Sequence, residues 1–142
     1  MKTIEEQLIL HERLRLKPYR DSVKGKLTIG VGRNLDDVGI SEDEALYLLR
    51  NDIAKVENEL KQFEWFNKLD GVRKKVLIDM DFNLGLPKFL TFKRMIAALK
   101  EGDFKKASDE MLDSRWAMQV KRRAVRLSIM METGQDYDEL GV

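Results

Sequence analysis

Two carboxylates near the start of the chain, Glu12 and Asp21, have the types and spacing that could do chemistry. Glu12 falls in line with Ile4 and Leu8 on the apolar side of an expected helix, whereas Asp21 lies beside a turn at the end of an expected strand. A carboxyl in an apolar setting stays protonated and can donate its proton, while a solvated carboxylate stays ionised. Acid/base cleavage of an acetal requires this pair of states. We therefore predict an acid role for Glu12 and a base role for Asp21.

Thr28, on the strand that follows Asp21, is the third candidate. Its hydroxyl could hold a water or a ligand near Asp21. The strand face that it shares with Gly30 has almost no side chains, so a flat ligand could lie against the backbone there. A purely structural alternative stays open, in which Glu12 pairs with an arginine, Asp21 closes an Asx turn and Thr28 is an ordinary strand residue.

The composition excludes several other kinds of chemistry. The chain has 142 residues, no cysteine and one histidine, His11. Disulfide frameworks, thiolate nucleophiles and multi-histidine metal sites are therefore excluded, and catalysis must rest on carboxylates and hydroxyls. We expect no metal and no organic cofactor. The net charge of +1 provides no global field that would attract polyanions.

Capping signals mark the elements that position these residues. Thr3 with Glu6 predicts a helix over 3–12, and Ser41 with Glu44 predicts a long amphipathic helix over 41–61. Between them, a period of two predicts a β-hairpin from Tyr19 to Gly32 with a glycine in its turn.

Later in the chain the period is helical. Helices are predicted over about 70–84, up to Gly102, after Asp103, and over about 120–132. The fold class is therefore α+β, mostly helical with a small early sheet. We predict one domain over 1–142, with a small lobe at about 13–60 and a helical lobe formed by about 1–12 and 61–142.

A long composite motif covers the candidate residues. It comprises Glu12 and Asp21 separated by eight residues, then Gly25, then Thr28-Ile29-Gly30-Val31-Gly32. This pattern resembles the signature of the phage-type lysozymes, glycoside hydrolase family 24, the muramidases typified by the T-even phage endolysins. Further matching segments follow in order and extend the resemblance from about residue 4 to residue 137: Gly39-Ile40-Ser41, Phe82-Asn83-Leu84-Gly85 and Ser114-Arg115-Trp116.

The resemblance implies a lysozyme-like fold and an endolysin-like muramidase. Such an enzyme would hydrolyse, with inversion, the β-1,4 bond between N-acetylmuramic acid and N-acetylglucosamine in bacterial peptidoglycan, for host cell lysis. It assigns the general acid to Glu12, the general base to Asp21 and the water-assisting hydroxyl to Thr28. It also places Arg123 close to Glu12. Four residues are expected to bind substrate: Gly30, Phe82, Asn83 and Arg123.

The expected partner is the peptidoglycan glycan strand, and the expected state is a monomer without stable membrane insertion. Residues 72–126 hold 14 basic and 7 acidic residues, which would attract the carboxylates of peptidoglycan. The start of the chain carries Glu5 and Glu6 before any apolar run, which is typical of neither a secretory signal nor a membrane span. We therefore expect the host cytoplasm before release and action in the periplasm or cell wall.

Three rival functions stay open. The first is a catalytically silent peptidoglycan-binding or phage-structural domain of the same fold. The second is a nucleic-acid-binding protein that uses Lys121, Arg122, Arg123 and Arg126, but the near-neutral net charge argues against it, and no nucleic-acid partner is expected. The third is a lytic transglycosylase, which needs only one carboxylic acid.

Two packing contacts are also predicted. The resemblance suggests that Arg33 pairs with Asp52, so that the hairpin is tied to the long helix. Trp116 is expected to be a packing anchor between helices, not a platform on which a sugar stacks.

Overall fold

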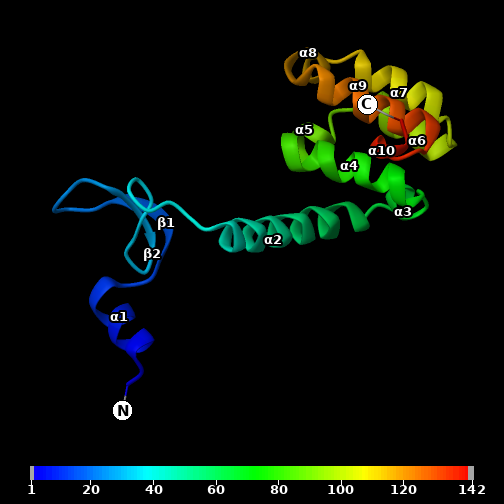
Figure 1. Cartoon of the computed structure of the whole chain (residues 1–142). Helices are drawn as coiled ribbons and strands as arrows, with labels where there is room; N and C mark the ends of the chain where they lie inside the picture. The colour runs from blue at the N-terminus through cyan, green and yellow to red at the C-terminus, as the bar shows by residue number, and fades with distance from the viewer. Residues whose placement is uncertain (1, 141–142) are drawn as a thin grey trace. The chain divides into compact units, whose positions relative to one another are not determined.

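The computed structural model describes residues 2–140, and side chains as far as residue 138 (Figure 1). It divides into two compact units, residues 1–48 and 49–142. Helices dominate and one three-stranded antiparallel sheet lies near the start, which confirms the α+β class. The predicted lobe boundaries, which join 1–12 to 61–142, stay a prediction.

Helix α1 (Ile4–Glu12) begins and ends as its sequence predicts. Thr3 Oγ1 accepts a hydrogen bond from Glu6 N at 3.1 Å, and Arg13 ends the helix with a φ of 67°. Within the first unit no residue of α1 is buried, and Ile4 is 60% exposed, so the expected burial of one side of this helix stays a prediction. In residues 2–48 the only buried side chain is that of Thr28, so this unit has no apolar core that could cover the helix.

The sheet contains β1 (Arg15–Arg20), β2 (Leu27–Gly30) and β3 (Arg33–Asn34) in that order. Tyr19 pairs with Thr28 and Arg20 with Leu27, which confirms the predicted hairpin. The first strand nevertheless begins at Arg15, four residues earlier than predicted. Pro18 is tolerated within it because β1 is an edge strand, where a missing N–H donor costs little.

Helix α2 (Glu42–Lys61) confirms the predicted long helix and crosses the division between the units. Its capping box is complete: Glu44 N donates to Ser41 Oγ at 3.2 Å, and Ser41 N donates to Glu44 Oε1 at 2.8 Å. Its last two turns bury Val56 and Leu60, while the residues before Ile53 are mostly exposed.

The second unit packs short helices around one apolar core. These are α3 (Glu64–Asn67), α4 (Gly71–Leu84), α5 (Leu86–Phe89), α6 (Lys93–Glu101), α7 (Phe104–Leu112), α8 (Arg115–Val120), α9 (Arg122–Thr133) and α10 (Tyr137–Leu140). Helix α7 packs against α6 and α9, and α4 packs against α5 and α9. Side-chain caps at Asp70, Asp103 and Ser114 begin three of these helices, the first two at the predicted helix starts. Within residues 2–140, no helix is both long and apolar enough for a membrane crossing.

Candidate functional site

Glu12, the last residue of α1, lies against Gly32. A Cβ atom placed on Gly32 would lie 2.8 Å from Glu12 Oε2, closer than real Cβ contacts allow. Gly32 also has a φ of 69°, a conformation that glycine adopts without strain. The backbone after β2 therefore forms the surface on which the Glu12 carboxyl rests. Sequence reasoning placed Gly32 in the motif but missed its contact with Glu12. The available signal was the glycine-rich turn, in which a positive φ is expected.

Asp21 is half-buried and closes the turn after β1. Its Oδ1 accepts from Val23 N at 3.2 Å and its Oδ2 from Lys24 N at 3.3 Å. The Asx turn of the structural alternative is therefore confirmed. Each carboxylate oxygen carries two lone pairs, so these two backbone contacts orient the group and leave acceptor capacity for a water.

Thr28 lies on the same face of the hairpin as Asp21. Asp21 N donates to the Lys26 carbonyl at 2.8 Å, and Thr28 pairs with Tyr19, so Asp21 and Thr28 are diagonal neighbours across the ladder. Diagonal neighbours are separated by about 7 to 8 Å, with enough room for a small molecule between them. The Thr28 hydroxyl donates to the Lys26 carbonyl at 2.9 Å, so its oxygen remains free to accept a hydrogen bond.

Arg33 fixes the segment that follows Gly32. Its guanidinium donates to Glu44 Oε1 at 2.8 Å and to the Gly39 carbonyl at 3.1 Å. The prediction that Arg33 pairs with Asp52 is wrong, because Glu44 in the first turn of α2 takes its place. Asp52 lies eight residues farther along that helix, or about 12 Å at the usual rise. The Arg33 contact, together with the amide of Ser41, lowers the pKa of Glu44 to about 2.

A short acidic loop holds the start of β2, a feature that sequence reasoning did not find. Asp36 Oδ2 accepts from Leu27 N at 2.8 Å. Asp37 pairs with Lys26 at 3.2 Å, and the Lys26 ammonium lowers the pKa of Asp37. These contacts fix the backbone next to Thr28. The signal in the sequence was the pair of aspartates after Asn34, a composition typical of side chains that bond to nearby backbone.

The remaining expected site residues occupy different settings. Gly30 has a φ of 71° and open space where a side chain would stand, so the flat backbone surface is present. Phe82 is 44% exposed. Asn83 Oδ1 accepts from the indole N–H of Trp116 at 2.8 Å, and Trp116 is buried, which confirms it as a packing anchor. Arg123 Nε donates to Asp79 at 2.8 Å. Glu12 belongs to the other unit, so its expected closeness to Arg123 stays a prediction.

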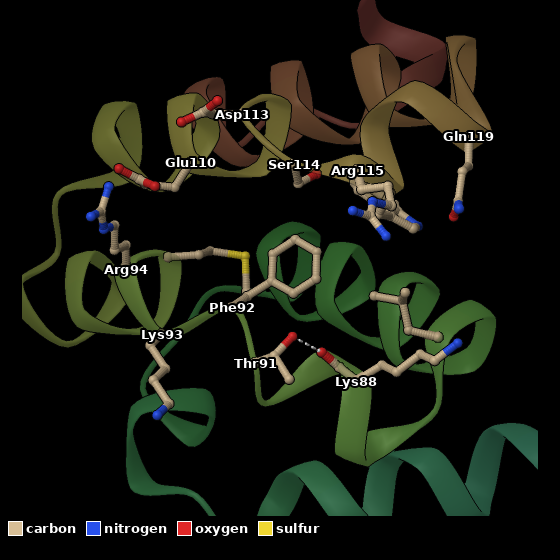
Figure 2. Close-up of a pocket in the computed structure, with 13 residues that line it drawn as sticks. Lys88, Thr91, Phe92, Lys93, Arg94, Glu110, Asp113, Ser114, Arg115 and Gln119 are labelled. Carbon is tan, nitrogen blue, oxygen red and sulfur yellow. Dashed lines mark hydrogen bonds between the residues drawn. The ribbon is translucent and has the colours of Figure 1, made fainter.

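A pocket of about 660 Å³ opens in the second unit between the α5–α6 segment and the α7–α8 segment (Figure 2). Phe92 and Trp116, both in its lining, meet edge to face with ring centroids 6.1 Å apart. Four cations and two carboxylates line it: Lys88, Lys93, Arg94, Arg115, Glu110 and Asp113. As far as the structure describes the chain, none of the four cations has a carboxylate within ion-pair distance, so they are available to an anionic ligand.

No group of three or more histidine, cysteine or acidic side chains suited to a metal ion occurs among residues 2–138, whose side chains are described.

Comparisons with known proteins agree over nearly the whole chain. A family model described as phage lysozyme matches residues 10–128. Two proteins of Dictyostelium discoideum, named probable T4-type lysozyme 1 and 2, are 26% and 25% identical, and each comparison covers 93% of this chain and 95% of the relative. The pre-baseplate central spike protein Gp5 of Enterobacteria phage T4 is 28% identical, over 93% of this chain and 28% of that protein.

Proposed function

Because this chain belongs to the phage lysozyme family and is thus a lysozyme-like muramidase, a glycoside hydrolase, we propose that it cleaves bacterial peptidoglycan to lyse a host cell. The proposed bond is the β-1,4 linkage between N-acetylmuramic acid and N-acetylglucosamine, and the proposed outcome is inversion. The observation that carries the proposal is the contact of the Glu12 carboxyl with the backbone at Gly32, in the same unit as Asp21 and Thr28.

The contacts of these three side chains support one division of roles. Glu12 donates its proton to the glycosidic oxygen as the bond breaks. A water on the opposite face of the sugar gives one proton to the Asp21 carboxylate while its oxygen attacks the anomeric carbon. Since the Thr28 hydroxyl proton is held by the Lys26 carbonyl, the Thr28 oxygen accepts the other hydrogen of that water and orients it. Both Asp21 and Thr28 therefore act as acceptors, which favours a water as their shared ligand.

We further propose that Gly30, Phe82, Asn83 and Arg123 contact the glycan strand. The open backbone at Gly30 suits a sugar ring, and the half-exposed Phe82 ring offers an apolar surface. The cations of the pocket in Figure 2 suit the carboxylates of peptidoglycan. The proposed working state is a monomer that is held in the host cytoplasm before release and acts in the periplasm or cell wall.

A turbidity assay on outer-membrane-permeabilised cells tests the activity. The parent chain should clear the suspension, whereas Glu12→Gln and Asp21→Asn should clear it at least about 100-fold more slowly, since each removes a proton-transfer group. Glu5→Gln is the matched control, because Glu5 is an exposed acid on the same helix. All variants should melt at temperatures close to that of the parent. Clearing by folded Glu12→Gln at the parent's rate would remove Glu12 from the acid role.

The anomeric configuration of the first product tests the proposed inversion. Inversion requires the two carboxyl groups to stand about 6.5 to 9.5 Å apart with a water between them. Proton NMR of the freshly released reducing end should therefore show the α-anomer before mutarotation. A β-anomer, or a glycosyl group trapped on Asp21, would mean retention. Anhydro ends without a reducing sugar would instead mean a lytic transglycosylase.

One relative favours a second candidate, a phage-structural domain of the same fold without activity. The central spike protein Gp5 contains a region similar to 93% of this chain, and its printed name describes a structural part. The presence of Glu12, Asp21 and Thr28 favours the enzyme. Binding of purified peptidoglycan without any release of reducing ends would establish the structural candidate instead.

A further inference from the structure

The catalytic proposal leaves one buried carboxyl group in the second unit unexplained. Asp81, in α4, is 1% exposed, and neither of its side-chain oxygens has a hydrogen-bond partner in the described part of the chain. An ionised carboxylate in that setting is costly, because it has lost its water without gaining a donor. A hydrophobic residue at this position would avoid that cost.

The Asp81 carboxyl faces the carboxyl of Glu59, which lies on the last turns of α2. Both residues line a pocket of about 410 Å³ in the second unit, together with Phe82. Two carboxyl groups that face each other cannot both ionise cheaply, but one proton between them makes one group a donor and the other an acceptor. A shared proton would therefore give one of the two Asp81 oxygens a hydrogen-bond partner.

Among the described residues, the surrounding charges provide no other partner for Asp81. From α2, Asp52 and Lys55 line the same pocket, and neither bonds to Asp81. The segment 85–87 contributes no charged side chain to it. From α9, Arg123 reaches α4 but bonds to Asp79. Burial first, and then the negative charge of Glu59, raise the pKa of Asp81 to about 6.

We propose that Asp81 and Glu59 hold one proton between them, that this proton fastens the second half of α2 to α4, and that its loss loosens this contact. Below the titration of the pair, a hydrogen bond joins the two helices. Above it, two facing carboxylates repel each other. Helix α2 crosses the division between the two units, and the shared proton would stabilise the contact between the second half of this helix and α4 within the second unit. The inference is independent of the proposed hydrolysis.

Thermal melts of the full chain from pH 4 to pH 8 test the proposal. Between about pH 4 and pH 6 the folded parent binds a proton that the unfolded chain releases, so its stability falls as the pH rises through this window. Asp81→Asn should lack that loss and exceed the parent in Tm at pH 7.5 by an amount on the order of 5 to 10 °C. At pH 4 the two proteins should melt together. A constant Tm difference across the range would overturn the proposal.

Glu57→Gln is the matched control. It removes a carboxylate from the same helix, and Glu57 pairs with Lys61 at 3.8 Å but does not line the pocket. Its melts should follow those of the parent at each pH. If Glu57→Gln removed the pH dependence of the Tm as completely as Asp81→Asn does, the pH dependence would come from the overall charge of α2, and the proposal would fail.

A titration of the unmodified protein needs no folded variant. In ¹³C NMR, the Asp81 carboxyl should titrate near pH 6 and the Glu59 carboxyl should shift in the same step. Amides of α2 from Ile53 onward should also exchange with solvent more readily at pH 7.5 than at pH 5, after correction for the intrinsic rates. An Asp81 midpoint near the ordinary value of 3.8, or no response from Glu59, would overturn the proposal.

Discussion

At the scale of single residues, Glu12, the proposed catalytic acid, rests against a neighbour that has no side chain. The carboxyl of Glu12 occupies the space in which any Cβ at position 32 would stand. Glycine is therefore required at position 32 for two reasons, the positive φ and the space that the Glu12 carboxyl occupies. Sequence reasoning identified the glycine as part of the motif but neither of these reasons. The roles of Glu12, Asp21 and Thr28 came from the motif. The contacts around them were not predicted: the pair of aspartates after Asn34 was a usable signal, but the pairing of Arg33 with Glu44 depends on how the chain after β2 turns back.

Gly32→Ala should therefore cost more activity than stability. The left-handed backbone should destabilise the fold by about 1 to 2 kcal/mol, and the new methyl group should displace the Glu12 carboxyl, so that lysis rates fall at least about tenfold. Gly102→Ala is the matched control, because Gly102 has a φ of 72° and open space beside it in the second unit. It should lose similar stability and keep full activity. Equal lysis by the two variants would show that Gly32 does not position the acid.

At the scale of elements, local signals predicted the helices well. The capping box at Ser41, the helix starts at Asp70 and Asp103, and the ends of α4, α6 and α9 lie close to the expected positions. The partner of Arg33 was predicted wrongly, because the sequence shows which face of the long helix a residue occupies but not which turn of that helix the preceding loop contacts. Arg33 therefore pairs with Glu44 and not with Asp52.

The ion pair between Arg33 and Glu44 should stabilise the first unit to an extent that depends on pH. Because the pKa of Glu44 is lowered to about 2 in the folded state from 4.5, its contribution is present above about pH 4.5 and is lost as the pH falls toward 2. Glu44→Gln should therefore lower the Tm at pH 7 and approach the parent at pH 2 to 3. Glu42→Gln, in the same turn, should not change with pH in this way. Melts in which the Glu44→Gln deficit is as large at pH 2 as at pH 7 would contradict the ion pair.

In the second unit, Arg73 joins the start of α4 to the end of α9. Its guanidinium donates to the carbonyls of Met131 and Glu132 at 2.6 and 3.0 Å, and lies 3.7 Å from the centre of the Phe104 ring. Lysine cannot supply this planar set of donors, so Arg73→Lys should lower the free energy of unfolding by about 1 to 3 kcal/mol. Urea denaturation measures it. Arg122→Lys, at an exposed position, should change it by less than about 0.5 kcal/mol, and equal losses would argue against the role of Arg73.

At the scale of the whole molecule, the helix and strand patterns predicted the α+β class, because local signals summed along the chain determine it. The family was predicted separately, from the resemblance of the motif that runs from Glu12 to Gly32. The burial of α1 depends on more than such signals. An apolar stripe shows that a helix needs a cover, but the first unit buries only the side chain of Thr28 among its described residues, so the cover expected from the helical lobe stays a prediction. The burial of Asp81 could not be predicted from the sequence either, because there it is one acidic residue between two apolar residues of a helix.

The charge distribution leads to a prediction about substrate. The near-neutral chain concentrates its basic excess in residues 72–126, and Lys88, Lys93 and Arg115 line one pocket without ion-pair partners among the described residues. If peptidoglycan carboxylates bind there, Lys88→Gln with Lys93→Gln should slow lysis several-fold at low salt, and the difference from the parent should shrink as salt screens the attraction. Lys100→Gln with Lys106→Gln, which removes the same charge outside this pocket, separates local binding from net charge.

The same double variant can be measured on cell walls whose peptide carboxylates have been converted to amides. On this substrate the parent and the variant in Lys88 and Lys93 should clear at the same rate, because the anionic groups that those ammonium groups attract are gone. An undiminished difference on amidated walls would assign the two lysines to the glycan or to the fold. An equal loss in the variant in Lys100 and Lys106 on native walls would show that overall charge, and not this pocket, draws the enzyme to its substrate.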